Sequence, residues 1–389
     1  MKTLLVVHYI QEVEKFKYIL PGLGDVHVVY DTEIGLSNAK QWQHNGKMTT
    51  YNVGVPRRPW WYILARHCDD YRFWKKLPQS EYYKNRARQS YGSYKHLVWL
   101  PLGWLKRLYR VPEYILEHVK KLSPDVLITT SLSFPPLHIQ AEYVMAAKEL
   151  GIPVISMLTN HDALTTKSVM WPKPDYLFLW NGNHSFEATM YHGIRASQIE
   201  FVGAFSFEHW LNVRPTRRDK FCAKWGLDIN KPIYTYLTSS NSISGLEVGA
   251  TEQWRDAMKN NGQLVVRAHP DKVHLMAGIP GVTAIPNVSE GTFTQEAFQL
   301  AVDTYAHSEA CYGINTSVFI EASLVGTPCY SLDVRLEDKL SMGGQSGIHF
   351  RQLKEILGED SPKLVREWLG IGKELPSSLI VKKIIAIIE

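Results

Sequence analysis

Short apolar stretches alternate with amphipathic ones along this chain, and the alternation predicts strands that are separated by helices. In the first half the expected strands are at 2–9, 25–31, 124–131, 154–159, 174–181 and 199–205. In the second half they are at 231–240, 263–270, 281–287, 309–314 and 328–334. Most of these strands are almost continuously apolar, which is typical of a parallel sheet that helices cover on both faces.

A polar, basic segment at 212–220, which contains Pro215, separates the two series and predicts a linker. We therefore expect an α/β fold with two Rossmann-like, doubly wound domains, at 1–211 and 219–365, and a helical end at 366–389. Open α/β sheets bind ligands beyond the carboxyl ends of their strands, so both domains would present such loops to a central cleft.

The composition is that of a globular protein with a sizeable core. Of the 389 residues, 45% are hydrophobic and 21% are charged. No apolar run approaches the ~20 residues of a transmembrane helix, and the apolar run near the N-terminus is too short for a signal peptide. The four cysteines lie far apart without a CxxC pair, so neither disulfides nor a zinc site are expected and a reducing cytoplasm is favoured.

The strand–helix rhythm is interrupted from about 32 to 112, and we expect an insertion of helix and loop at about 56–112. Between Arg57 and Arg110 there are 13 Lys and Arg but 3 Asp and Glu, a local excess of +10 in a chain of net charge +5. The same segment contains 13 aromatic residues. Such a surface suits an anionic membrane or an anionic polymer. The alternative is that its tryptophans pack as core and its basic residues form a solvated face.

The segment 313–328 ends an apolar strand and begins an apolar helix. Asn315, Thr316 and Ser317 stand at the predicted start of this helix, where exposed backbone N–H groups and the helix dipole favour an anion. Glu321 follows Ser317 by one helical turn on the same face, and its carboxylate could accept both hydroxyl groups of a ribose. These residues predict a nucleotide site. The alternative is that Thr316 caps the helix and Glu321 faces water.

Two further strand ends carry polar side chains that suit a diphosphate. Arg267 and His269 come at the end of the strand at 263–270, whose last residue is a proline that forces a turn. A guanidinium and an imidazole could clamp a diphosphate there, although a surface arginine and a core histidine would give the same pattern. Ser239 and Ser240 end the first strand of the second half, where a phosphate-facing loop belongs.

The loop that follows the strand at 154–159 carries His161 and Asp162. An imidazole or a carboxylate at a strand end could deprotonate an acceptor hydroxyl. The alternative is that Asp162 is the N-cap of whatever helix follows.

Several signatures are absent from the sequence. There is no GxGxxG after a strand, no GxxxxGK[ST] and no GxSxG. No D-x-D motif offers ligands for a metal-bridged diphosphate, and the 15 histidines show no metal-binding spacing. We therefore expect no metal, and no cofactor other than a nucleotide-sugar that serves as co-substrate.

Four segments together resemble the GT-B glycosyltransferase superfamily. Segment 174–210 is similar to the end of its N-terminal domain, where a strand and a helix lead into the linker. Segments 264–270 (LVVRAHP) and 313–328 are similar to the R-x-H-P strand end and the donor-site helix of bacterial CDP-glycerol glycerophosphotransferases and capsule glycosyltransferases. The loop 159–168 is similar to one in surface-polysaccharide members, except that Asn160 and His161 stand where Trp-Asp-Asn would begin.

The resemblance implies a role for each residue of the donor site. Arg267 and His269 would contact the diphosphate. Thr316 and Ser317 would cradle phosphate, and Glu321 would hold the ribose.

On the acceptor side the resemblance implies Asp162 as the base, with His161 as the next candidate. The implied enzyme is a metal-independent glycosyltransferase that moves a sugar from a nucleotide-activated donor to a surface glycan or its lipid-linked precursor. It would be cytoplasmic and peripheral at the inner face of the membrane, with 57–110 on the anionic surface and the helix at 366–389 crossing back to the first domain. No nucleic-acid partner is expected.

Three alternatives share this architecture. The first is a transferase of glycerol or ribitol phosphate, which differs only in its donor. The second is a nucleotide-sugar 2-epimerase, in which the aromatic insertion would have no role. The third is a non-catalytic protein that binds glycan or membrane, against which the joint presence of Arg267, His269 and Glu321 argues.

Overall fold

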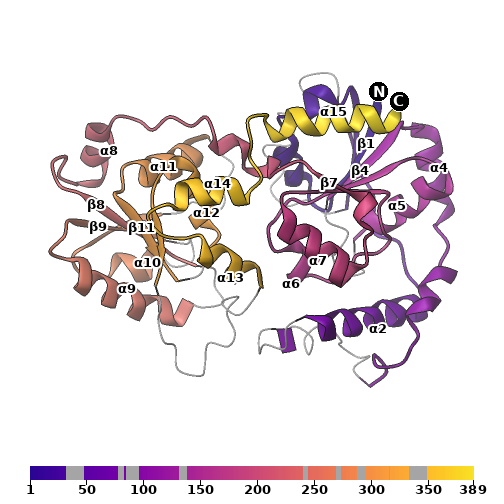
Figure 1. The fold of residues 1–389 in the computed structure, drawn as a ribbon, viewed down its shortest axis with the longest axis horizontal. Helices are drawn as coiled ribbons and strands as arrows, with labels where there is room; N and C mark the ends of the chain where they lie inside the picture. Colours follow the sequence, from indigo (N-terminus) through magenta and orange to yellow (C-terminus); the bar gives the residue numbers. More distant parts are fainter. Residues whose placement is uncertain are drawn as a thin grey trace. The chain divides into compact units, whose positions relative to one another are not determined.

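The computed structural model describes residues 1–31, 48–77, 83–84, 96–130, 138–239, 244–268, 273–286, 295–314, 316–332 and 348–389. These residues form two compact units. Unit 1 consists of residues 1–208 and 369–389, and unit 2 consists of residues 209–368. Each unit contains a β-sheet with helices packed around it (Figure 1).

Unit 1 contains a seven-stranded parallel sheet in the order β3-β2-β1-β4-β5-β6-β7. Its strands are β1 (Lys2–Val6), β2 (Asp25–Tyr30), β3 (Met48–Asn52), β4 (Val126–Thr129), β5 (Val154–Met157), β6 (Tyr176–Leu179) and β7 (Ile199–Phe201). Its α-helices are α2 (Trp60–Lys76), α4 (Glu113–Leu122), α5 (Gln140–Glu149), α6 (Ala163–Thr166), α7 (Gly182–His192) and α15 (Pro376–Ile388). Short 3-10 helices are η1 (Ile10–Phe16), η2 (Leu20–Gly22), η5 (Gly103–Leu108), η6 (Ala196–Gln198) and η7 (Phe205–Trp210), the last of which reaches the border with unit 2.

Unit 2 contains a five-stranded parallel sheet in the order β10-β9-β8-β11-β12. Its strands are β8 (Ile233–Leu237), β9 (Gln263–Ala268), β10 (Val282–Pro286), β11 (Ala310–Gly313) and β12 (Cys329–Ser331). Its helices are α8 (Arg218–Trp225), α9 (Ser244–Met258), α10 (Val273–Ala277), α11 (Gln295–Ala306), α12 (Val318–Val325), α13 (Ile348–Glu355) and α14 (Ser361–Trp368). The predicted fold class, an α/β protein with two Rossmann-like parallel sheets, is confirmed.

Strands β4 and β5 are buried at every position, which is why their sequences lack the polar alternation of a half-exposed strand. Helix α9 ends at Met258. Gly262 follows in the turn into β9, where a Cβ atom would come within 2.5 Å of the Pro232 carbonyl oxygen. Close approach of two backbones explains the glycine better than helix termination does.

The last helix, α15, packs in unit 1. Ile380 and Ile384 are fully buried in the same core cluster as Leu5 of β1. Glu208 holds the start of this helix, because its carboxylate accepts hydrogen bonds from the Ser377 backbone N–H at 2.8 Å and from the Ser377 hydroxyl at 2.6 Å. Figure 1 shows α15 beside the other elements of unit 1.

The insertion at 56–112 contributes both core and exposed aromatic side chains. Helix α2 packs against η5, and Asp69 of α2 contacts Lys106 of η5. Phe73 and Trp74 are buried, so part of the aromatic content is core. The exposed tryptophans, each with more than half of its surface accessible, are Trp60, Trp99 and Trp104. No helix in the described part of the chain combines the length and the apolar character that crossing a membrane requires.

Candidate functional site

The strand order of the unit 2 sheet reverses between β8 and β11. Ligands of open α/β sheets bind at such a switch point, outside the carboxyl ends of the strands. Two of the predicted residues, Ser239 and Thr316, follow the carboxyl ends of β8 and β11, and both side chains are buried. Predicted phosphate-binding residues therefore lie at the position that the topology favours.

Three side chains from different elements meet beside this switch point. Arg267, at the end of β9, is 5% exposed, and its guanidinium carbon lies 5.2 Å from the ring centroid of Tyr305 on α11. The Tyr305 hydroxyl donates to Glu321 Oε2 on α12 at 3.3 Å. Tyr305 thus lies between a buried cation and a carboxylate, and its ring gives the guanidinium a cation–π contact.

Burial governs the charge of the carboxylate in this group. It raises the pKa of Glu321 to about 7, although the Arg267 charge and the Tyr305 hydroxyl both act to lower it. Burial also raises the pKa of Tyr305 well above its usual range, so the phenol stays protonated and can only donate to the carboxylate. The side chain of Glu321 is half-buried, which contradicts the simple alternative that it faces water.

Helix α12 has Ser317, rather than the Thr316 of the capping alternative, at its N-cap position, but it is the Thr316 side chain that caps it. The Thr316 hydroxyl accepts a hydrogen bond from the Val318 backbone N–H at 3.3 Å, and Gly326 ends the helix with a left-handed φ of 104°. Ser317 makes no capping hydrogen bond through its side chain and is exposed. Capping therefore accounts for Thr316 but not for Ser317.

Sequence reasoning missed two residues of this site, Tyr305 and Glu247. Glu247 lies in the first turn of α9, is fully buried, and accepts a hydrogen bond from the Ser239 backbone N–H at 2.5 Å. A lone carboxylate in the first turn of a helix that follows a strand was the signal, as it was for Glu321. Tyr305 gave no such signal, because an aromatic residue in an apolar helix is typical of core.

The predicted residues Ser240, His269 and Asn315 lie outside the described residues, so their roles stay predictions.

In unit 1, His161 and Asp162 follow β5 and precede α6. Asp162 occupies the N-cap position of α6 without a capping hydrogen bond from its side chain, and its Oδ2 instead accepts from the Thr166 hydroxyl at 2.9 Å. The His161 carbonyl oxygen accepts from His184 Nε2 at 3.2 Å. Burial lowers the pKa of His161, while the charge of Asp162 raises it.

A neighbouring lysine, Lys15, links this loop to η1, the 3-10 helix that follows β1. Lys15 Nζ donates to Asn160 Oδ1 at 3.2 Å. Burial lowers the pKa of Lys15, and the charges of Glu12 and Asp162 partly restore it. The loop that carries Asp162 thus lies in a polar network rather than in open solvent.

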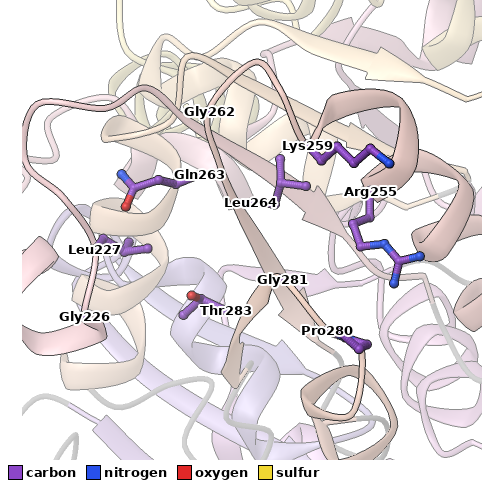
Figure 2. A pocket seen from close by; sticks show the side chains of 10 residues that line it. All are labelled: Gly226, Leu227, Arg255, Lys259, Gly262, Gln263, Leu264, Pro280, Gly281 and Thr283. Atoms are coloured by element: carbon purple, nitrogen blue, oxygen red, sulfur yellow. The ribbon is translucent and has the colours of Figure 1, made fainter.

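A separate cavity of about 520 Å³ lies at the opposite edge of the unit 2 sheet (Figure 2). It is lined by the first residues of β9, including Gln263 and Leu264, and by Arg255 and Lys259 of α9. Because it lies at the amino ends of the strands, it is not part of the site around Arg267.

The sequence matches no protein-family model and no curated protein. Solved structures share the fold. A UDP-GlcNAc 2-epimerase from Methanocaldococcus jannaschii has a TM-score of 0.54 at 13% identity, over 100% of this chain and 99% of that one. The Neisseria meningitidis UDP-GlcNAc 2-epimerase bound to UDP-GlcNAc has a TM-score of 0.52 at 12% identity, over 99% of this chain and 100% of that one. A glycosyltransferase from Rickettsia africae has a TM-score of 0.52 at 12% identity, over 100% of this chain and 97% of that one. The chain therefore has the GT-B type of fold.

The raised pKa of Glu321 predicts a pH-dependent stability. In the unfolded chain the carboxyl ionises near 4.5, whereas in the fold it ionises near 7. The fold therefore loses stability as pH rises through this window, by on the order of 1–3 kcal/mol. Glu321→Gln removes the ionisation, so we expect the variant to melt above wild type at pH 8 and close to it at pH 5.

The matched control is Glu252→Gln, which makes the same change at an exposed position of α9. Thermal unfolding of the three proteins across pH 5 to 8 measures the effect. A difference between Glu321→Gln and wild type that does not change with pH would contradict the burial argument.

Proposed function

We propose that this protein is a glycosyltransferase that moves a sugar from a nucleotide-activated donor to a surface glycan or its lipid-linked precursor. The observation that carries the proposal is the pairing of buried Arg267 with Glu321, through Tyr305, beside the switch point of unit 2. A guanidinium suits phosphate and a carboxylate suits a ribose diol, so the pair matches the diphosphate and the ribose of a nucleoside diphosphate.

In this scheme the donor binds to unit 2. Arg267 holds the diphosphate, Ser317 and the backbone at the start of α12 add uncharged donors, and Glu321 accepts the ribose hydroxyls. The positive potential of Arg267 and of the helix N-terminus stabilises the departing diphosphate, so the scheme needs no metal at the donor.

The acceptor reacts in unit 1, with Asp162 as the base and His161 as the next candidate. The Thr166 hydroxyl bonded to Asp162 Oδ2 orients that carboxylate. The carboxylate would take the proton of an acceptor hydroxyl.

A screen of nucleotides against the purified protein tests the donor site. We expect one of UDP, GDP, CDP, CMP and dTDP to raise the melting temperature selectively, since a ligand at ~100 times its dissociation constant adds roughly 2.7 kcal/mol of stability. Glu321→Ala should weaken that shift, and the exposed-site control Glu252→Ala should keep it. No shift with any nucleotide would contradict the proposal and favour a non-catalytic binding protein.

The identity of the stabilising nucleotide separates the alternatives. CDP would favour a polyol-phosphate donor. With UDP, incubation with UDP-GlcNAc alone would distinguish transfer from epimerisation, because a 2-epimerase converts that sugar without an acceptor. Such conversion would replace the transferase proposal by an epimerase, the activity named for two of the proteins with this fold.

Asp162→Asn tests the acceptor base. Asparagine keeps an oxygen acceptor for the Thr166 hydroxyl but cannot take a proton, so we expect donor turnover to be lost while the nucleotide-induced thermal shift remains. Thr166→Ala is the converse control, because it removes the hydrogen bond that asparagine keeps and leaves the carboxylate in place. Full turnover in Asp162→Asn would move the base elsewhere, with His161 next.

The exposed part of the insertion suits a membrane that carries acidic lipids. Besides Trp60, Trp99 and Trp104, the apolar side chains of Leu97 and Leu108 are exposed there. Exposed basic side chains accompany them at Arg57, Arg72, Lys75, Lys76, Arg107 and Arg110. Tryptophan side chains partition into the headgroup region, and cations add attraction to anionic lipid. We propose that this surface keeps the enzyme peripheral at the inner face of the membrane.

Sedimentation with vesicles tests the membrane surface. We expect binding to phosphatidylglycerol-containing vesicles, weaker binding to pure phosphatidylcholine, and loss of binding in the triple variant Trp60→Ala, Trp99→Ala, Trp104→Ala. Phe186→Ala on α7, which is 58% exposed, is the control for loss of an exposed aromatic ring. Equal sedimentation of the triple variant and the control would show that the tryptophans do not carry the binding.

A further inference from the structure

The sheet of unit 1 has its own switch point, between β1 and β4. His8 follows the end of β1, and Asp31 follows the end of β2 directly. His138 comes from the segment between β4 and α5. The carboxyl edge of the sheet therefore brings together two imidazoles and a carboxylate that are remote in sequence.

These three side chains are in mutual contact. His8 Nδ1 is hydrogen-bonded to Asp31 Oδ1, and His138 Nδ1 lies 4.0 Å from Asp31 Oδ2. The rings of His8 and His138 have their centroids 3.6 Å apart. One ligand atom from each residue lies within 4.8 Å of the others. Two atoms bound to one ion at about 2.0–2.2 Å lie no more than about 4.3 Å apart, so small side-chain rotations would bring all three onto one ion.

Neighbouring groups hold two of the three residues in place. The Ile139 backbone N–H donates to Asp31 Oδ2 at 2.8 Å, and the His8 backbone N–H donates to Glu12 Oε2 at 3.1 Å. The Thr130 hydroxyl also donates to Glu12 Oε2, at 3.3 Å. Outer contacts of this kind orient ligands and are a regular part of metal sites in proteins.

The local charges are compatible with a bound cation. The nearby Arg58 is neutralised by Glu142, whose carboxylate accepts from Arg58 Nε at 2.6 Å and from Nη2 at 2.7 Å. Glu12 adds a carboxylate beside His8.

We propose that His8, Asp31 and His138 bind one divalent ion of the zinc class at the carboxyl edge of the unit 1 sheet. Two imidazole nitrogens and one carboxylate favour Zn²⁺, Co²⁺ or Ni²⁺ over Mg²⁺ and Ca²⁺, which take oxygen ligands. Three protein ligands leave a coordination position for water or substrate. The proposal goes beyond the donor site of unit 2 and does not depend on it. The linear spacing of histidines could not have indicated it, because the ligands come from separate elements.

Cobalt binding to the untagged, chelator-treated protein tests this site. We expect one Co²⁺ per chain, visible absorption bands of a four- or five-coordinate ion, and displacement by Zn²⁺. His8→Asn and His138→Asn should each lower the affinity for Co²⁺ by about 100-fold or more, because each removes a ligand directly. Circular dichroism checks that each variant is folded. If one variant is unfolded, the Co²⁺ titration of the wild-type protein still tests the proposal.

The matched control is His27→Asn. His27 is also paired with an aspartate, since its Nε2 lies 3.4 Å from Asp25 Oδ2 on the same sheet, but it belongs to no such group of three among the described residues. We expect its Co²⁺ affinity to equal that of wild type. The proposal is overturned by an absence of stoichiometric binding to wild type, by wild-type affinity in both site variants, or by equal loss in His27→Asn. If the protein binds metal but no nucleotide raises its melting temperature, the metal site is supported and the proposed donor site alone is contradicted.

Discussion

The proposed donor site and the proposed metal site both depend on one topological constraint, the reversal of strand order within a fully parallel sheet. Parallel strands end at one edge, and at the reversal the chain segments that leave two adjacent strands run in opposite directions. In unit 1 the reversal lies between β1 and β4, and in unit 2 it lies between β8 and β11. Side chains that follow those strands have room for a ligand and still rest on a rigid base. His8 in one unit and Thr316 in the other owe their positions to this arrangement.

The cost of burying charge shapes what gathers at these edges. A buried guanidinium or carboxylate is tolerated only with partners, so charged residues occur there as small networks. In unit 2 the network joins Arg267, Tyr305 and Glu321, and burial moves the pKa of the carboxyl to about 7. In unit 1 the partners are imidazoles, a lysine and carboxylates, and burial lowers the pKa of His138 and of Lys15. The two edges therefore differ in chemistry, and we propose a nucleoside diphosphate as the ligand of the unit 2 edge and a cation as the ligand of the unit 1 edge.

The insertion at 56–112 differs from these edges, because its aromatic residues are divided between the core and the surface. Its buried aromatic residues, such as Phe73, attach α2 to the unit, and Phe73 lies 5.1 Å from the ring of His192 on α7. Its exposed tryptophans, Trp60, Trp99 and Trp104, keep more than half of their surface accessible, which is why we propose that they face a membrane. The same composition thus serves two purposes, and the division between them depends on the packing of α2 against η5.

The fold class can be predicted from the sequence, because almost continuous apolar strands followed by helices can be buried only as parallel sheets covered on both faces. The sequence also indicates those candidate site residues that a local pattern marks, such as Glu321 in an apolar helix and Arg267 at a strand end. Which remote residues meet can be seen in the folded structure alone. Tyr305 between Arg267 and Glu321, and His138 beside His8, have no pattern in the sequence, since their positions follow from strand order and helix packing. A functional group within one element can be recognised from its neighbours in the sequence. A site that spans several elements forms only when the sheet brings the ends of its strands together.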